Sequence, residues 1–264
     1  MLKVLFLGDI NGKIGRKAVR QILPNLKSEL RPDLTIANVE NIAHGTGVTE
    51  STLKEILEAG VDWCTNGDHA FDQQKQSEIY NKFSLLKPAN FPPDTPGQGY
   101  AIIEVEKYKI LLINLIGRVF MSANYDCPFR KLDEILANLP NENLSAIIVD
   151  IHAEATAEKV ALKHYADGRV SAILGTHTHI PTADAEITAK GTAYITDVGM
   201  AGFAEGCIGV EKENIIKTFL TQIKEEHIIP ETGKAILNGI LITIDPETKK
   251  AVEIKQINKF INIT

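Results

Sequence analysis

Residues 170–179 have the sequence VSAILGTHTH, in which an apolar run leads directly into two histidines. The apolar run predicts a buried β-strand over residues 170–174. His177 and His179 are two residues apart, so on an extended backbone both imidazoles would point into one small volume at the end of that strand. Such a pair is suited to binding a metal ion, although two neighbouring histidines also occur as surface pairs or within packed cores.

Four other predicted strands also end in residues that can bind a metal. The strands over 2–7, 34–39, 61–65 and 145–151 are followed by Asp9, by Glu40 and Asn41, by Asp68 and His69, and by His152. In open α/β sheets this edge is where ligands bind. The five strand ends together supply enough oxygen and nitrogen atoms for two metal ions.

Each of these residues also has an ordinary structural interpretation. Asp9 and Asn41 could cap a turn or a helix. His152 could be a hydrogen-bonded core histidine, and Asp68 with His69 could belong to an Asn-Gly-Asp turn. The recurrence at five strand ends favours the metal site over these separate explanations. Three histidines have no partner in the sequence, and we interpret them as surface residues: His44, His164 and His227.

The composition predicts one globular α/β domain over residues 1–264. A chain of this length, 44% hydrophobic and 23% charged, is sufficient for a large core. A net charge of -6 argues against a broad nucleic-acid surface but permits a small phosphorylated ligand whose charge metal ions neutralise. No apolar run approaches the roughly 20 residues of a membrane span, and the first run breaks at Gly8, too early for a signal peptide. We therefore expect a cytoplasmic protein, and the odd number of cysteines, 3, predicts free thiols.

Short aliphatic runs alternate with helical patterns, which predicts a layered α/β fold. Further strands are expected as a hairpin over 101–106 and 109–115, at 193–196, and as a C-terminal pair over 235–244 and 251–257. Helices are expected over 13–27, 49–59, 72–83 and 154–165, and a proline-rich loop over 86–97. Two sheets packed face to face, with helices outside, fit this pattern better than a single sheet.

Five longer motifs occur along the chain: GDING at 8–12, NVEN at 38–41, DIHAEAT at 150–156, GTHTH at 175–179 and YITDVGM at 194–200. In this order they resemble the YmdB-like branch of the calcineurin-like metallophosphoesterases. The resemblance implies a four-layer αββα sandwich with two mixed β-sheets and a dinuclear metal centre. It also implies hydrolysis of a small phosphodiester substrate such as a 2′,3′-cyclic nucleotide.

The resemblance further implies a role for each candidate residue. Glu40 would bridge the two ions, because a carboxylate can bind one metal with each oxygen. The remaining ligands would be Asp9, Asn41 and His179 for the first ion and Asp68, His152 and His177 for the second. Oxygen and imidazole ligands without thiolates favour iron or manganese over zinc or magnesium. Two such cations can hold a bridging hydroxide that attacks phosphorus, and His69 would protonate the leaving alkoxide.

At one position the chain departs from this family. Gly67-Asp68-His69 stands where these enzymes usually have Gly-Asn-His. An ionised Asp68 would still bind the second metal and would add a negative charge, so we expect tighter cation binding and weaker activation of water. Asn66 is not a replacement ligand, because moving it inward would displace His69. We interpret the nearby Asn11 and Arg16 as capping or surface residues rather than phosphate contacts.

Two alternatives to a phosphodiesterase remain at this point. A phosphomonoesterase of the nucleotidase type would use the same metal core, and Asp68 would also suit a weakly active metal-binding regulatory protein. Because this fold commonly self-associates, we further expect a homo-oligomer, with no membrane partner.

Overall fold

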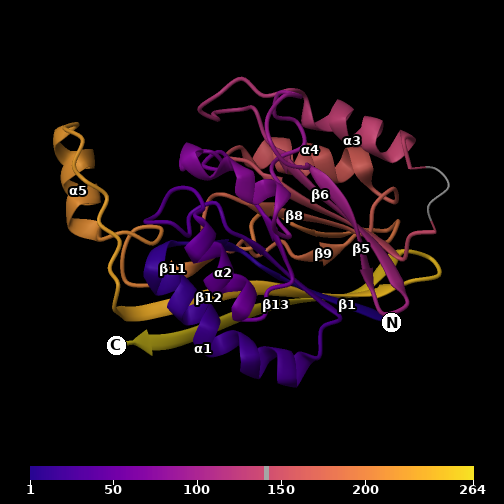
Figure 1. The fold of residues 1–264 in the computed structure, drawn as a ribbon, viewed down its shortest axis with the longest axis horizontal. Coiled ribbons are helices and arrows are strands. Elements are labelled where there is room, and N and C mark those ends of the chain that lie inside the picture. Colours follow the sequence, from indigo (N-terminus) through magenta and orange to yellow (C-terminus); the bar gives the residue numbers. More distant parts are fainter. Residues whose placement is uncertain (140–142) are drawn as a thin grey trace.

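Two β-sheets packed face to face form the centre of the protein (Figure 1). The structure is a computed structural model that describes residues 1–139 and 143–264. The first sheet contains β1 (Leu2–Leu7), β2 (Asp9–Ile10), β3 (Leu34–Asn38), β4 (Trp63–Thr65), β11 (Met200–Phe203), β12 (Gly233–Asp245) and β13 (Lys250–Ile263). The second contains β5 (Tyr100–Val105), β6 (Tyr108–Ile116), β7 (Ala146–His152), β8 (Ala172–Thr176), β9 (Glu186–Ile187) and β10 (Ala193–Ile195). The strand order is β2-β11-β12-β1-β3-β4, with β13 along β12, in the first sheet and β5-β6-β7-β8-β10-β9 in the second.

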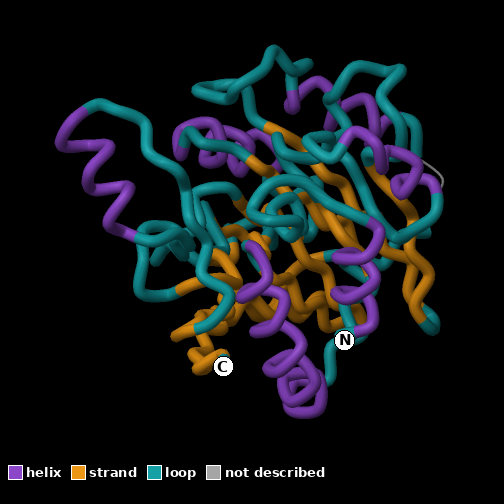
Figure 2. The backbone as a smooth tube through the Cα atoms, turned by 60° about the vertical axis from the view of Figure 1, so that its left-hand side comes forward, coloured by secondary structure: helices purple, strands orange, loops and turns teal. Residues whose placement is uncertain are grey.

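Helices cover the outer face of each sheet, as Figure 2 shows. The helices are α1 (Gly12–Leu30), α2 (Glu50–Glu58), α3 (Pro128–Ala137), α4 (Thr156–Ala166) and α5 (Lys212–Thr221), with a 3-10 helix, η1, over Gln74–Asn81. Helices α1 and α2 lie against the first sheet, and α3 and α4 lie against the second. One apolar cluster joins the two sheets, with Phe6 of β1 and Ile148 of β7 among its members. A second joins the first sheet to α1 and α2, and a third joins the second sheet to α3 and α4. These clusters confirm the predicted αββα sandwich of two mixed sheets.

The predicted strands are confirmed, although β13 runs to Ile263, beyond its predicted end at 257. The short strands β2, β9 and β11 were not predicted, and several helices differ from prediction. The segment expected as an α-helix over 72–83 is the shorter 3-10 helix η1. Helix α1 continues through Pro24 to Leu30, beyond its predicted end. Helices α3 and α5 were not predicted, although α3 begins with Pro128 at a favoured first-turn position and buries Leu132 on its inner face.

Helix α5 projects away from the body of the protein (Figures 1 and 2). None of its residues is buried, and the side chains of Phe219 and Leu220 are exposed. Its sequence nevertheless carries an apolar stripe at helical spacing, formed by Ile215, Ile216, Phe219 and Leu220, which the prediction overlooked. The expected homo-oligomer stays a prediction. Of the helices in the described ranges, none combines the length and the apolar content that crossing a membrane would need.

Parallel pairing places the polar strand ends at one edge of the molecule. In the first sheet β1 is parallel to β3, and β3 is parallel to β4. In the second sheet β7 is parallel to both β6 and β8. The carboxyl ends of these strands therefore carry their following residues to the same side of the sandwich.

Candidate metal centre

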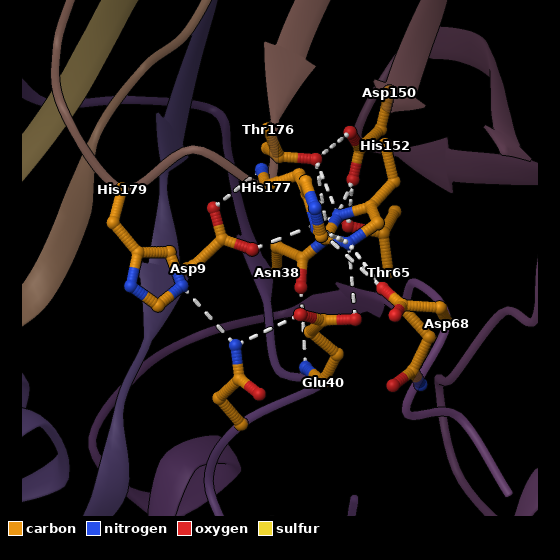
Figure 3. Close-up of polar contacts among 12 residues, drawn as sticks. Asp9, Asn38, Glu40, Thr65, Asp68, Asp150, His152, Thr176, His177 and His179 are labelled. Carbon is orange, nitrogen blue, oxygen red and sulfur yellow. Dashed lines mark hydrogen bonds and ion pairs between the residues drawn. The ribbon is translucent and has the colours of Figure 1, made fainter. Parts of the chain in front are cut away.

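The structure brings the predicted metal ligands together in two adjoining groups (Figure 3). The first contains Asp9, Glu40 and His179, and the second contains Glu40, Asp68, His152 and His177. Within each group the potential ligand atoms lie within 4.8 Å of one another. Glu40 belongs to both groups, which is the position that a bridging carboxylate would need.

In the first group, one nitrogen of His179 is directed at its neighbours by a backbone contact. Its Nδ1 lies 2.8 Å from the carbonyl oxygen of Ile208, which can only accept a hydrogen bond. Nδ1 therefore carries the proton and leaves the lone pair of Nε2 toward Asn41, whose Nδ2 lies 3.2 Å away. The same amide donates to Glu40 Oε1 at 2.8 Å. Because amide oxygen and nitrogen can be exchanged by a flip, Asn41 is able to present its oxygen to a cation here.

In the second group, the contacts converge on His152. Its Nε2 lies 3.0 Å from Glu40 Oε2, 3.1 Å from Asp68 Oδ1 and 3.0 Å from His177 Nδ1. His152 and Glu40 are buried, and the side chain of Asp68 is 12% exposed. Four potential ligands thus face one small volume that is nearly closed to solvent.

Hydrogen bonds behind the second group determine which ring nitrogen faces that volume. Thr176 Oγ1 donates to Asp150 Oδ1 at 2.8 Å, so it accepts from His152 Nδ1 at 3.0 Å. The Nε2 atom of His177 lies 3.0 Å from Glu154 Oε2. Both histidines can therefore offer a lone pair to a metal, His152 through Nε2 and His177 through Nδ1. Glu154 was not predicted as part of the site. The feature of the sequence that could have indicated it is its acidic side chain two residues after His152.

The backbone conformation of His177 and His179 corrects the initial expectation. Strand β8 ends at Thr176, and both histidines have positive φ angles, 104° for His177 and 65° for His179. They are not on an extended segment, and each imidazole enters a different group. A turn in the left-handed region, rather than strand alternation, separates them into the two groups.

A buried ion pair holds this turn in place. Lys159 Nζ donates to the Thr176 carbonyl at 2.7 Å and to Asp197 Oδ2 at 2.9 Å. The same carboxylate accepts hydrogen bonds from the backbone and the hydroxyl of Thr178. Lys159 and Asp197 are fully buried. They fix the residue between the two histidines, so they position the ligands without joining either group.

The charge of the donor set fits bound cations. Asp9 is fully buried, and its Oδ1 has no hydrogen-bond partner among the described residues, although His152 Nδ1 lies 3.6 Å away. Burial raises the pKa of Asp9, because the charged form loses its hydration. Burial acts in the same direction on Asp68, but hydrogen bonds from His152 and His177 and their positive charge, when these imidazoles are protonated in place of binding a metal, hold its pKa well below the usual range. Carboxylates gathered with so little solvent need compensating positive charge, and oxygen and imidazole donors without thiolate suit first-row transition metals.

His69 lies beside the two groups without belonging to either. Its backbone N–H donates to Glu40 Oε2 at 3.3 Å, and its Nδ1 lies 2.7 Å from Asp72 Oδ2. Burial lowers the pKa of His69, but the nearby carboxylates of Glu40, Asp68 and Asp72 outweigh burial and raise it. A protonated imidazole at the rim of the site is suited to giving a proton to a leaving group.

Apart from Asn11, the other polar residues considered from the sequence have structural partners or lie at the surface. Asn66 donates to the carbonyl of Leu86, and Arg16 pairs with Glu55. Asn11 precedes α1 but makes no side-chain capping bond and is buried, so the capping or surface interpretation is wrong for it. The prediction of surface positions is confirmed for His44, His164 and His227, and that of free thiols for Cys64, Cys127 and Cys207.

The chain is similar to known proteins over nearly its whole length. The family model described as "YmdB-like protein" matches residues 5–257. The chain is 44% identical over 257 residues to the "2′,3′-cyclic-nucleotide 2′-phosphodiesterase" of Bacillus subtilis (strain 168), covering 97% of this chain and 96% of that protein. Among solved structures, a novel phosphatase from Mycoplasma pneumoniae has a TM-score of 0.93 at 38% identity, covering 99% of this chain and 94% of the other. A hypothetical protein from Thermus thermophilus has a TM-score of 0.91 at 40% identity, with coverage of 98% and 99%.

Proposed function

Because this chain belongs to the YmdB-like protein family, we propose that it is a metal-dependent phosphodiesterase that hydrolyses small phosphodiesters such as 2′,3′-cyclic nucleotides. The observation that carries the proposal is the position of Glu40, whose carboxylate belongs to both groups of potential ligands. The name of the Bacillus subtilis relative supports the choice of substrate class. The presence of buried carboxylates and imidazoles without a thiolate supports iron or manganese as the bound metals.

In this proposal the side chains of the site have three roles: metal binding, orientation of the histidines and proton donation. Asp9, Asn41 and His179 would hold the first ion, Asp68, His152 and His177 would hold the second, and Glu40 would contribute to both. When bound, the two ions would activate a water molecule and neutralise charge on the phosphoryl oxygens. Glu154 and the carbonyl of Ile208 keep the two turn histidines in the required tautomers. His69 donates a proton to the departing ribose oxygen, and Asp72 orients its imidazole.

Replacement of His69 by alanine tests the proposed function and the acid role together. Turnover of 2′,3′-cyclic AMP, measured with added manganese or ferrous iron, should fall by about 10²- to 10⁴-fold, the usual contribution of a general acid. Metal content should not change, because His69 lies outside both groups. His164→Ala, at an exposed position on α4, is the matched control and should keep full activity. Full turnover by His69→Ala would exclude the acid role, and no turnover by the metal-loaded wild type would exclude the substrate.

Comparison of bis-aryl and mono-aryl phosphates distinguishes a phosphodiesterase from a phosphomonoesterase. Both reactions can use the same metal ligands, so the ligands do not separate them. We expect faster turnover of the diester.

Asp68 is expected to reduce the activity of the metal centre while strengthening its hold on the metals. In Asp68→Asn, a neutral amide replaces a carboxylate that lies 3.1 Å from His152 Nε2. Removing this negative charge leaves more positive charge at the centre, so the acidic limb of the pH–rate profile should move to lower pH. Metal content after dialysis, measured by elemental analysis, should fall because one anionic ligand is lost. Unchanged metal content together with an unchanged pH profile would contradict the proposed effect.

A further inference from the structure

A cavity of the protein lies at the opposite end of the second sheet from the metal-centre residues. Its volume is about 230 Å³, and its lining includes Ser171, immediately before β8. Strand β8 then runs to Thr176, next to His177. Five residues of extended chain span about 17 Å. The cavity is therefore separate from the candidate metal centre.

Three turns from distant parts of the chain converge on this cavity. Gly168 and Arg169 lie between α4 and β8, Lys190 and Gly191 between β9 and β10, and Lys249 with Lys250 at the hairpin between β12 and β13. Hydrogen bonds connect the turns to one another. The backbone N–H of Gly168 donates to Thr192 Oγ1 at 2.9 Å, and that of Ala251 donates to the carbonyl of Gly191 at 2.8 Å. The lining is thus a connected part of the fold rather than three independent loops.

Two glycines make room for lysine side chains along the lining. A Cβ atom at Gly168 would lie 2.9 Å from the Cβ of Lys190, and one at Gly191 would lie 2.7 Å from the Cγ of Lys250. Both glycines also have positive φ angles, 79° and 94°, which other residues rarely adopt. The aliphatic stems of Lys190 and Lys250 therefore lie directly across glycine backbone at the cavity.

The cavity concentrates positive charge in a protein whose net charge is -6. Four cations line it, and none of the described residues that line it is acidic. Arg169 is paired with Asp133 outside the lining, whereas no described carboxylate forms an ion pair with Lys190, Lys249 or Lys250. Like charges gathered in a concave site repel each other and attract a counter-ion.

We propose that this cavity binds a small anion that carries two or more phosphoryl charges. Lysine ammonium groups bind phosphate as point charges, and the N–H groups of Arg169 that do not face Asp133 can add hydrogen bonds to it. The size of the cavity matches a small molecule rather than a nucleic-acid strand, which would need an extended basic surface. The ligand is either an inorganic polyphosphate or the phosphate of a nucleotide, since both present the same chemistry. The proposal does not depend on the function of the metal centre.

Labelling with pyridoxal 5′-phosphate tests this site directly. The reagent combines a phosphate with an aldehyde that forms an imine with a nearby lysine, and borohydride reduction fixes the adduct for peptide mass spectrometry. With reagent and protein at equal concentrations, we expect labelling of Lys190, Lys249 or Lys250. The control lysines are Lys255 and Lys259, which are exposed on β13. Labelling at the cavity should exceed labelling of the controls by about tenfold, which is the effect of one charge-assisted contact with the phosphate. Arg169→Ala should reduce this preference, and the exposed control Arg130→Ala should not.

Competition identifies the ligand class in the same experiment. Inorganic pyrophosphate should suppress the labelling, whereas potassium chloride at equal ionic strength should not. Suppression by AMP as well would assign the site to nucleotide phosphates, and suppression by pyrophosphate alone would assign it to polyphosphates. Equal labelling of all five lysines, or equal suppression by pyrophosphate and potassium chloride, would overturn the proposal. Because the described residues of both metal-ligand groups include no lysine, failure of the proposed phosphodiesterase would not alter this readout.

Discussion

Glu40→Gln is expected to abolish nearly all phosphodiesterase activity while leaving the fold intact. Glu40 Oε1 faces the first group, 2.8 Å from Asn41 Nδ2, and Oε2 faces the second, 3.0 Å from His152 Nε2. Glutamine has nearly the same shape but offers one oxygen and no charge, so it cannot serve both groups. We expect turnover of 2′,3′-cyclic AMP to fall by about 10³-fold or more, because the lost carboxylate supports both water activation and charge neutralisation.

Elemental analysis and circular dichroism of the same sample show whether the loss arises at the metal centre. Bound metal should fall below that of the wild type, and the spectrum should be unchanged. Glu58→Gln, at an exposed position at the end of α2, is the matched control and should behave as the wild type. A Glu40→Gln variant that keeps full metal content and wild-type turnover would rule out a bridging role for Glu40.

Lys159→Met is expected to lower the free energy of unfolding by about 3–5 kcal/mol, the cost of breaking a buried ion pair by removing one partner. Lys159 is fully buried, with Nζ 2.9 Å from Asp197 Oδ2. Without the lysine, the Asp197 carboxylate would stay buried with no cationic partner. Urea unfolding of the metal-free proteins measures the difference without a contribution from metal binding.

Two comparisons separate the broken ion pair from a general effect of the substitution. Lys163→Met removes an ion pair one turn further along α4, whose partner Glu186 is 49% exposed, and a contact of Nζ 4.8 Å from the centroid of the Tyr194 ring. The loss should be about 1–2 kcal/mol, less than that of the buried pair. The double variant Lys159→Met with Asp197→Asn should be more stable than Lys159→Met alone, because no buried charge is left without a partner. Equal stability of Lys159→Met and Lys163→Met would show that the buried pair contributes little.

The strands and the ligand-bearing strand ends were predictable because they depend on local pattern. A buried strand such as β1 or β7 requires a short apolar run, and that run is visible without knowledge of its neighbours. Polar residues directly after such runs, including Asp9 and Glu40, interrupt the pattern and are equally visible. The arrangement of the layers then follows from the alternation of strands and helices.

Two errors in the predicted helices have different origins. Helix α5 has no buried residue, but its apolar stripe of Ile215, Ile216, Phe219 and Leu220 indicates a helix, and the prediction overlooked it. Residues 74–81 form a 3-10 helix in place of the expected α-helix. The two forms differ by one residue in hydrogen-bond spacing, and a short sequence does not discriminate between them well.

For the site, local sequence specified which residue types stand at the strand ends, because each strand and its final residue lie within a few positions of one another. The division into two groups depended on tertiary structure. His177 and His179 separate because their backbone adopts positive φ angles, and the buried Lys159–Asp197 pair holds the residue between them. Glu154 and the carbonyl of Ile208 acquire their roles only where the folded chain places them against the imidazoles. These contacts join segments up to 38 residues apart, and local pattern carries no information about which distant groups will meet.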